Sequence, residues 1–366
     1  MPRSILRRAA VPALALTILL PAFALLSCKS SSNESSPSSS AQSPAAGGST
    51  TLPASTAAAT DTCKPGNGPP KEGTGPPGLP GRITFVRLVF GCQPDIYTAN
   101  ADGSNATALT TDPGLDDEVD LSADGQKVVF FSNRSGNAFL YTENIDGSGL
   151  AQLTSGPGGD TSPRWSPDGS QIAYSHSGSL VVMNADGSNA RTIMELQPAA
   201  SAEPCRAGAF VGGWSPDGQK LTYYSAIIRP GGDNIFWVCS INQDGSDIKV
   251  LVADPAGKLH AEPYWSPDGT KIVFRDDRDG DCSQPGTGKC NYDIFVLDLT
   301  TGQQTNVTKD PKLDIEPTWS PDGQWILFAS NREDPNFDLY IIHPDGSGLT
   351  RILNDPDAKD SYPSWR

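Results

Sequence analysis

The sequence is poor in basic charge and in histidine. It holds 27 Lys and Arg against 42 Asp and Glu, and only three His. Six of the bases but only three of the acids precede Arg82, so the acidic excess is concentrated in the rest of the chain. Proteins that bind nucleic acid neutralise phosphates with a basic surface. Nucleic acid is therefore not an expected partner.

Several motifs of enzymes and metal sites are also missing. No CxxC pair occurs and the three His are scattered, which argues against zinc. There is no G-x-S-x-G nucleophile elbow. The acidic run from Asp276 to Asp281 lacks the D-x-D-x-D-G order of an EF-hand. We expect no catalytic residue and no cofactor, with Ca²⁺ as the one ion left open.

The first residues have the layout of an export signal. Arg3, Arg7 and Arg8 precede an apolar run over residues 9–26. Cys28 follows Leu25-Leu26-Ser27, which resembles a bacterial lipobox. This resemblance implies a signal peptide over residues 1–27, an acyl anchor on Cys28, and a lipoprotein of the bacterial periplasm, outer membrane or cell surface. A plain signal peptide with Cys28 incidental is the alternative.

Large apolar side chains are scarce between the signal and Arg82. Residues 28–81 consist mostly of Ser, Ala, Thr, Gly and Pro. Such a segment cannot offset the entropy of folding, so we predict a disordered tether. A flexible coil of this length reaches on the order of 40 Å. The tether would hold a domain at residues 82–366 away from a membrane.

One phrase recurs through that domain. It begins at Ser122 as Ser-Ala-Asp-Gly, and it returns as Ser-Pro-Asp-Gly at Ser166, Ser215, Ser266 and Ser320. The spacings of 44, 49, 51 and 54 residues suit one four-stranded propeller blade with its loops. Pro presets the first central position of a turn, and Gly supplies the positive φ that lets two strands pair.

Strand-like runs surround each turn. A Trp or Leu precedes it, a β-rich run such as Val128-Val129-Phe130 follows, and a third run leads into a shared Asp-Gly-Ser turn. The domain begins with Ile83-Thr84-Phe85, in phase with a second strand. It ends with Pro363-Ser364-Trp365, in phase with a first strand. The sequence therefore predicts an all-β, six-bladed propeller of four-stranded antiparallel blades, closed by a C-terminal innermost strand beside N-terminal strands.

These features together resemble TolB-type propeller repeats, a WD40-like family also called PD40. The resemblance rests on the W-S-P-D-G phrase, the D-G-S turn and loops such as Ser132-Asn133-Arg134-Ser135-Gly136, and it covers nearly all of residues 83–366. It implies the fold and a protein-binding or ligand-binding role. TolB itself carries an α/β domain before its propeller, and residues 29–81 do not match one.

Two positions of the repeat are candidates for binding at the channel mouth. Five residues before each Trp or Leu stand Asp116, Asp160, Ala209, His260, Asp314 and Asp360. Three residues before it stand Glu118, Ser162, Val211, Glu262, Glu316 and Tyr362. Free carboxylates around the axis would bind Ca²⁺ or a basic peptide. Alternatively, the Asp residues bond nearby amides and the Glu residues form bonds between blades.

The cysteines of an exported chain are expected to form disulfides. Setting Cys28 aside leaves an even number. Cys282 and Cys290 flank a short Gly/Pro-containing excursion, which favours a bridge between them. Cys205 with Cys239, and Cys63 with Cys92, are weaker candidates.

We therefore expect a monomeric, non-catalytic binding module anchored to a bilayer. Its partner would be an envelope protein or peptide, which could be basic, and it would bind at the channel mouth and at the loops over residues 194–210 and 278–292. Two alternatives remain: a carboxylate-based polysaccharide lyase or hydrolase, and a gating module for a separate peptidase.

Overall fold

The computed structural model describes residues 75–198, 203–227, 234–253, 258–279, 291–333 and 335–366. The chain divides into two units, residues 1–62 and 63–366, and all described residues belong to the second. The expected signal peptide, Cys28 and the Cys282–Cys290 pair lie outside the described residues. Within the described ranges, no helix is long and apolar enough to span a membrane.

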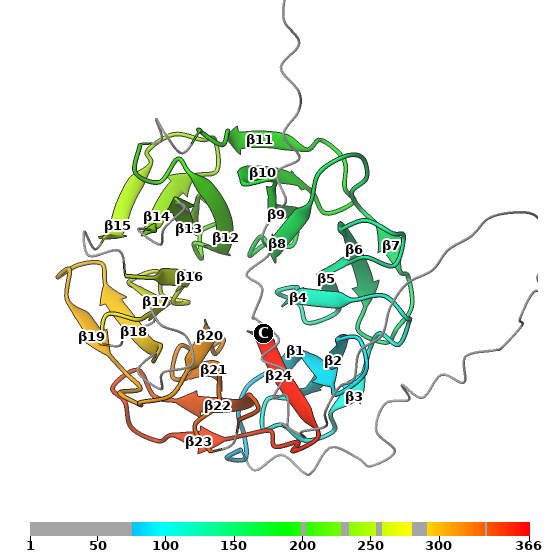
Figure 1. Cartoon of the computed structure of the whole chain (residues 1–366), viewed down its shortest axis with the longest axis vertical. Helices are drawn as coiled ribbons and strands as arrows, with labels where there is room; N and C mark the ends of the chain where they lie inside the picture. The colour runs from blue at the N-terminus through cyan, green and yellow to red at the C-terminus, as the bar shows by residue number, and fades with distance from the viewer. Residues whose placement is uncertain (1–74, 199–202, 228–233, 254–257, 280–290, 334) are drawn as a thin grey trace, which may run out of the picture. The chain divides into compact units, whose positions relative to one another are not determined.

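The described strands form six antiparallel sheets of four strands each, arranged around a central axis (Figure 1). The innermost strands are β24 (Ala358–Trp365), β4 (Asp116–Leu121), β8 (Asp160–Trp165), β12 (Gly208–Trp214), β16 (His260–Trp265) and β20 (Asp314–Trp319). The second strands are β1 (Arg82–Val89), β5 (Lys127–Ser132), β9 (Gln171–His176), β13 (Lys220–Ile227), β17 (Lys271–Asp276) and β21 (Ile326–Ser330).

The outer half of each sheet completes the unit. The third strands are β2 (Asp95–Asn100), β6 (Phe139–Asn144), β10 (Ser179–Asn184), β14 (Ile235–Asn242), β18 (Asp293–Asp298) and β22 (Asp338–Ile342). The fourth are β3 (Thr107–Ala108), β7 (Ala151–Gln152), β11 (Arg191–Met194), β15 (Lys249–Ala253), β19 (Gln304–Asn306) and β23 (Thr350–Arg351). We number the sheets as blades 1 to 6, beginning with the sheet that contains β1.

Blade 1 is closed by the two ends of the domain. Its strand order is β24-β1-β2-β3, and Ile83 pairs with Trp365 across the junction. The predicted six-bladed fold and its closure are thus confirmed. A closed ring leaves no long sheet edge available for pairing with another chain.

The repeated turn owes its shape to its Ser and Asp. Ser122 Oγ donates to Asp124 at 2.6 Å and accepts from the Lys127 N–H at 2.9 Å, while Gly125 takes a φ of 69°. The copies beginning at Ser166, Ser215, Ser266 and Ser320 repeat the Ser–Asp bond. In one copy the hydrogen bond from Ser266 lowers the pKa of Asp268 to about 2. These serines are therefore structural.

The hydrophobic core lies between blades rather than within one. Each of six buried clusters joins two neighbouring blades, as when Val129 of blade 2 packs with Trp165 of blade 3. The other clusters connect the remaining pairs around the ring. The Trp that ends the innermost strand belongs to this packing in blades 1, 3, 4 and 6, and the partly buried Trp265 of blade 5 packs against one of these clusters.

The packed chain starts earlier than Arg82. The Gly75 N–H donates to the Asp102 carbonyl, and the Trp365 indole donates to the Pro80 carbonyl at 2.7 Å. Leu79 packs against the cluster between blades 6 and 1. Residues 75–81, expected in the tether, therefore contact the propeller.

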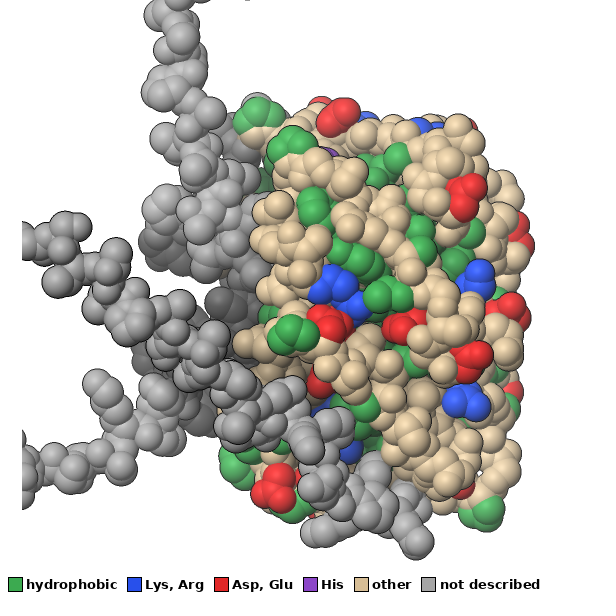
Figure 2. All heavy atoms as spheres, turned by 90° about the vertical axis from the view of Figure 1, so that its right-hand side faces the viewer, with side chains coloured by type: hydrophobic (Ala, Val, Ile, Leu, Met, Phe, Trp, Pro, Cys, Tyr) green, Lys and Arg blue, Asp and Glu red, His purple; other side chains and the backbone are tan. Residues whose placement is uncertain are grey.

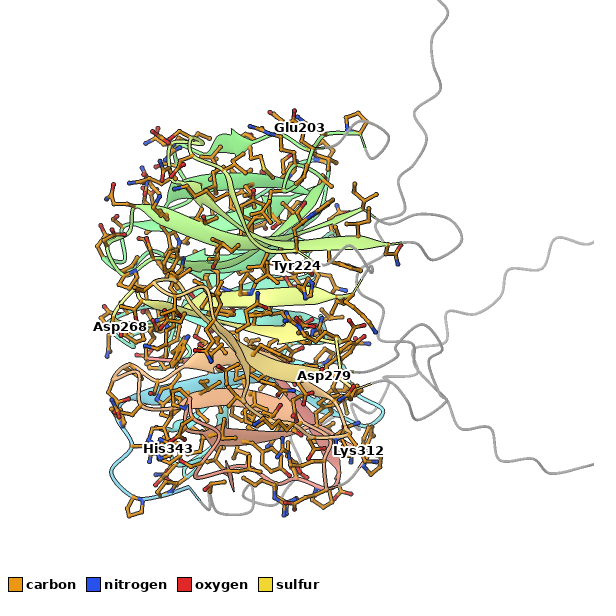
Figure 3. The ribbon with its side chains drawn as sticks, turned by 90° about the vertical axis from the view of Figure 1, so that its left-hand side faces the viewer. Glu203, Tyr224, Asp268, Asp279, Lys312 and His343 are labelled. Atoms are coloured by element: carbon orange, nitrogen blue, oxygen red, sulfur yellow. A yellow bond between two sulfur atoms is a disulfide. The ribbon has the colours of Figure 1, made fainter. Side chains whose placement is uncertain are left out.

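The two faces of the ring carry different connections. We call the side with the Ser-Pro-Asp-Gly and Asp-Gly-Ser turns the turn face, and the side with the loops between second and third strands the loop face. Figure 3 shows Asp268 and His343 at the turn face and Asp279 and Lys312 at the loop face. On the outer side of the ring seen in Figure 2, hydrophobic side chains are interspersed with polar and charged ones.

Candidate functional site in the central channel

The residues five positions before the Trp or Leu stand where the innermost strands begin. All six are buried, and each pairs across the sheet with a residue near the end of the second strand. Asp116 is opposite Ser132, for example, and Asp314 is opposite Ser330. Their side-chain partners therefore come from their own blade.

In blade 2 the partner is an arginine. Arg134 Nη2 donates to both oxygens of Asp116, at 3.0 and 2.9 Å, and reaches Asp112 at 2.6 Å. The guanidinium also lies over the rings of Phe130 and Tyr141, 5.3 and 5.1 Å from their centroids. Burial still raises the pKa of Asp116, against the hydrogen bonds it accepts. We call this arrangement, an Arg held by two Asp and stacked on two rings, the arginine clamp.

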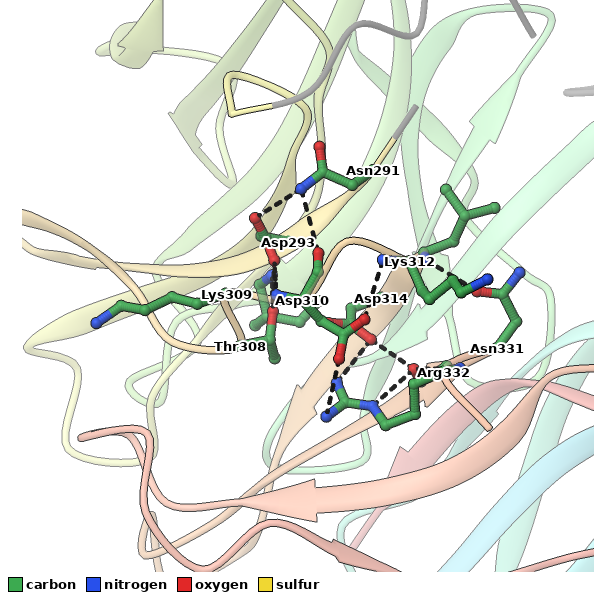
Figure 4. Close-up of polar contacts among 12 residues, drawn as sticks. Asn291, Asp293, Thr308, Lys309, Asp310, Lys312, Asp314, Asn331 and Arg332 are labelled. Atoms are coloured by element: carbon green, nitrogen blue, oxygen red, sulfur yellow. Dashed lines mark hydrogen bonds and ion pairs between the residues drawn. The ribbon is translucent and has the colours of Figure 1, made fainter. Parts of the chain in front are cut away.

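Blade 6 repeats the clamp. Arg332 donates to Asp314 at 2.8 Å, lies 3.8 Å from Asp310, and covers Phe328 and Tyr340. Figure 4 shows this guanidinium between the two carboxylates, next to a second cluster around Asp293. Asp293 accepts bonds from the side chains of Asn291, Asn306 and Thr308 and from the amide of Asp310.

Blade 1 builds the clamp from another backbone position. Arg87 lies within β1, at the level that Ser132 occupies in blade 2, yet its guanidinium is 5.3 and 5.1 Å from the rings of Phe85 and Tyr97. It donates to Asp360 at 2.7 and 2.8 Å and lies 3.3 Å from Asp355. The same charge arrangement is reached by a different route.

Two blades use histidine at this level. His176 bonds Asp160 at 2.7 Å in blade 3. In blade 5 the roles are exchanged: His260 comes from the innermost strand and bonds Asp276 at 2.7 Å. Burial alone would raise the pKa of Asp276, but bonds from His260 and Arg278 outweigh it and lower that pKa. These carboxylates also have basic partners from their own blade.

Blade 4 has Ala209 and Ser225 at this level and a disulfide nearby. Cys205 and Cys239 are bonded, with Cα atoms 5.9 Å apart, and both are fully buried. Cys239 pairs across the sheet with Tyr223, the position that Tyr141 takes opposite Phe130 in blade 2. Cys92 is also disulfide-bonded, and its expected partner Cys63 lies outside the described residues.

The residues three positions before the Trp or Leu form bonds between blades. Glu118, Ser162, Glu262, Glu316 and Tyr362 all have left-handed φ values, from 47 to 57°. These residues lie where the pairing register shifts, which turns their side chains along the ring.

The three glutamates of this set each accept a backbone N–H of the next blade. Glu118 accepts from Ser162 at 2.5 Å, Glu262 from Glu316 at 2.7 Å, and Glu316 from Tyr362 at 2.5 Å. The bonds between blades considered from the sequence are therefore present. We call these bonds the glutamate staples.

Burial changes the acidity of the staples. It raises the pKa of Glu118, and together with the nearby Glu262 it raises the pKa of Glu316 to about 8. Burial and the Glu118 charge raise the pKa of Asp117 to about 7. Arg275 lies 3.1 Å from Glu262 and provides a positive charge. Among the described residues, no group of three His, Cys, Asp or Glu is placed to hold a metal ion.

A cavity of about 330 Å³ opens where the channel meets the turn face. Its apolar wall consists of residues from five blades: Ala123, Pro167, Pro216, Pro267, Pro321 and the indoles of Trp165, Trp214, Trp265 and Trp319. Arg164, Tyr264, Thr318 and Arg366 contribute its larger polar side chains. Pockets for organic ligands are typically of this size and of this mixed character.

Arg164 was not anticipated from the sequence. It is a buried guanidinium on an innermost strand, and it donates to the carbonyls of Gly212 and Pro163 at 2.8 and 2.7 Å. The sequence feature that could have identified Arg164 is its position directly before a Trp, in a strand predicted to line the channel. Gly212 is required here because a Cβ would lie 2.0 Å from the Pro263 carbonyl oxygen.

Comparison with known proteins agrees with this architecture. Residues 81–205 match the family model of PD40, the TolB beta propeller domain. In structure, the chain resembles TolB from Acinetobacter baumannii with a TM-score of 0.61, over 79% of this chain and 68% of that one, at 19% identity. The described domain therefore has the β-propeller fold of TolB.

Curated relatives match the TolB-like propeller over shorter stretches. The uncharacterized peptidase YuxL of Bacillus subtilis (strain 168) is 27% identical over 158 residues, which are 38% of this chain and 22% of that protein. The uncharacterized protein Atu1656 of Agrobacterium fabrum is 30% identical over 153 residues, or 42% and 44%. The Tol-Pal system protein TolB of Syntrophus aciditrophicus is 42% identical over 48 residues, or 13% and 10%. The chain thus spans less than half the length of each.

Proposed function

We propose that this TolB-like propeller is a non-catalytic binding module that presents its central channel to a partner at the bacterial envelope. The observation that carries the proposal is the contrast inside the channel. The carboxylates anticipated as reactive or metal-binding groups are held in clamps and staples, whereas the turn face has a cavity of about 330 Å³. A binding function needs the cavity but no free acid–base pair.

The outer surface of the described residues has few exposed large hydrophobic side chains. Its exposed large hydrophobic side chains are single residues on five different blades: Phe90, Leu150, Leu196, Val250 and Leu349. Isolated apolar residues of this kind are normal on soluble domains. The loops at 194–210 and 278–292 remain candidates for contact, although residues 199–202 and 280–290 lie outside the described ranges.

The envelope location rests on the predicted acyl anchor at Cys28 and on the likeness to a Tol-Pal system protein. It is tested with the full chain in a bacterium fed radiolabelled palmitate. We expect label in the membrane fraction and none for Cys28→Ser. Equal labelling of the two chains would remove the anchor from the proposal.

The binding function is tested by crosslinking the full chain on intact cells and reconstituting any captured partner. A saturable complex that weakens when Thr318→Arg fills the turn-face cavity supports the proposal. Turnover of pectic or other acidic sugars, abolished by Glu316→Gln, would replace it with the lyase or hydrolase alternative.

A second function is favoured by one finding. The likeness to an uncharacterized peptidase fits a propeller that gates a separate hydrolase. Copurification of a peptidase in stoichiometric amount, with activity that changes when the propeller is removed, would establish that alternative.

A further inference from the structure

The turn-face cavity differs in charge from the rest of the domain. The chain has a formal net charge of −15, yet the cavity wall among the described residues contains two arginines and no acidic side chain. Both arginines are close to the axis, on β8 and directly after β24. The charged side chains that line the cavity are therefore all basic, in a molecule with an acidic excess.

Arg164 is held in place and still has donors to offer. Its Nε and Nη1 bond carbonyls, which fixes the plane of the group, and its charge lies 5.2 Å from the Tyr264 ring centroid. Arg164 also forms a side-chain hydrogen bond with Tyr264. A guanidinium has five N–H donors, so these three bonds leave others for a ligand. Burial lowers the pKa of Arg164, but Tyr264, Asp120 and Glu118 outweigh burial and raise it. The group stays charged.

Asp120, the carboxylate with the largest effect on Arg164, already has other partners. Asp120 accepts the Trp165 N–H at 2.8 Å and the Ser364 hydroxyl at 2.9 Å, and it lies 3.7 Å from the Arg366 guanidinium. Asp120 is buried and is not part of the cavity wall. It offsets some of the positive charge without occupying the cavity.

The wall also has a place for a ring or an apolar side chain. Four tryptophans and four prolines are among the residues that line the cavity, and Gly213 contributes no side chain. A Cβ at Gly213 would lie 3.0 Å from the Tyr264 ring, so the absence of a side chain lets that ring lie against the strand. Aromatic-lined pockets with one fixed cation suit ligands that have an apolar body and an anionic end.

We infer that the turn-face cavity binds the C-terminal carboxylate of a peptide whose last residue is aromatic or apolar, with Arg164 as the principal ligand to the carboxylate. Arg366 adds charge at the opening, and the indoles contact the terminal side chain. Guanidinium and carboxylate groups match in geometry and form the stronger class of hydrogen bond. This inference rests on the proposed binding function and names the ligand.

The test uses the full chain with Cys28→Ser and three probes: N-acetyl-phenylalanine, N-acetyl-phenylalaninamide and benzoate. Calorimetry measures affinity, and tryptophan emission excited at 295 nm reports on the indoles, since these probes do not absorb there. We expect saturable binding of the acid and at least tenfold weaker binding of the amide, because the amide lacks the charge that pairs with Arg164.

Two arginine variants locate the site. Arg164→Met should weaken binding of the acid at least tenfold and leave binding of the amide unchanged. Arg366→Gln should weaken binding of the acid by a smaller factor. Arg191→Met is the matched control, since Arg191 is an exposed residue of β11 that bonds the Gln243 carbonyl. If Arg164→Met does not fold, the comparison of acid and amide in the unmodified cavity and the Arg366→Gln variant still show whether the cavity binds a carboxylate.

Each remaining outcome overturns the inference. Equal affinity for the acid and the amide would show that the cavity does not recognise a carboxylate. Tight binding of benzoate alone would show that the ligand is a free aromatic acid rather than the end of a peptide. No binding of any probe would reject the site. If the crosslinked partner still binds in that case, the binding function stands without this ligand; if it does not, both proposals fail.

Discussion

Blades 2 and 4 solve the same mechanical problem with different chemistry. Each must attach the loop before its innermost strand to the rest of the sheet. Blade 2 does so with Arg134 between Asp112, Asp116 and the Tyr141 ring. Blade 4 does so with the Cys205–Cys239 disulfide.

The correspondence extends to single positions. Cys205 stands four residues before Ala209, as Asp112 stands four residues before Asp116. Cys239 takes the place of the ring on the third strand. A covalent bond therefore replaces an ion pair stacked on aromatic rings, and the repeat tolerates this exchange because only the attachment is required.

Breaking the clamp should have the largest effect. Arg134→Met leaves Asp116 buried without its positive partner, and removing one member of a buried pair costs about 3–5 kcal/mol. Urea unfolding of the full chain measures this loss. The exposed control Arg191→Met should lose less than about 0.5 kcal/mol. Equal losses for the two variants would mean that the clamp does not stabilise blade 2.

Removing the disulfide should cost nearly as much. Cys205→Ala with Cys239→Ala releases a loop with a sequence separation of 34 residues. The chain-entropy relation then gives about 3–4 kcal/mol. The same unfolding experiment places this loss beside that of Arg134→Met. A loss under about 1 kcal/mol would show that the two attachments are not equivalent.

The staples should matter less than either attachment. Glu118→Ala leaves the Ser162 N–H without its acceptor, at a cost of about 1–3 kcal/mol. Glu118→Gln keeps an acceptor oxygen and should lose less, which makes it the matched control in thermal unfolding. Similar losses for both would assign the effect to side-chain size rather than to the bond.

Stability should fall as pH rises because of Glu316. Its pKa is about 8 in the folded chain, above its ordinary value, so the folded state holds a proton that the unfolded state releases. The stabilisation is complete below the unfolded pKa and is lost as pH rises through about 8. Glu316→Gln should flatten the fall in Tm between pH 5 and pH 9. An unchanged slope would contradict the assignment.

The histidine pair of blade 3 should contribute least. His176 is partly exposed, with 43% of its side chain accessible, and exposed ion pairs are worth about 0–1 kcal/mol. His176→Gln should therefore lose less than about 1 kcal/mol in urea unfolding. A loss as large as that of Arg134→Met would show that the pair acts as a full clamp despite its exposure.

The sequence by itself determined the propeller. The Ser-Pro-Asp-Gly phrase returns about every fifty residues. In this repeat Ile83 falls at the position of a second strand and Trp365 at the position of a first strand, and these two strands are neighbours in a blade. Turn geometry and strand alternation are local properties, because each depends on residues close together in the chain. The positions of the glutamate staples also repeat, so the sequence predicted for them either a cation-binding ring or bonds between blades.

Only the tertiary structure decided what the polar residues do. Arg87 joins the same clamp as Arg134 from a different backbone position, which spacing within the repeat does not reveal. Arg164 and Arg366 are 202 residues apart in the chain, yet both line one cavity. Ion pairs and cavities depend on which side chains meet after the ring closes. Closure brings together residues of different blades, and the sequence of a single blade does not show which residues of the other blades it will contact.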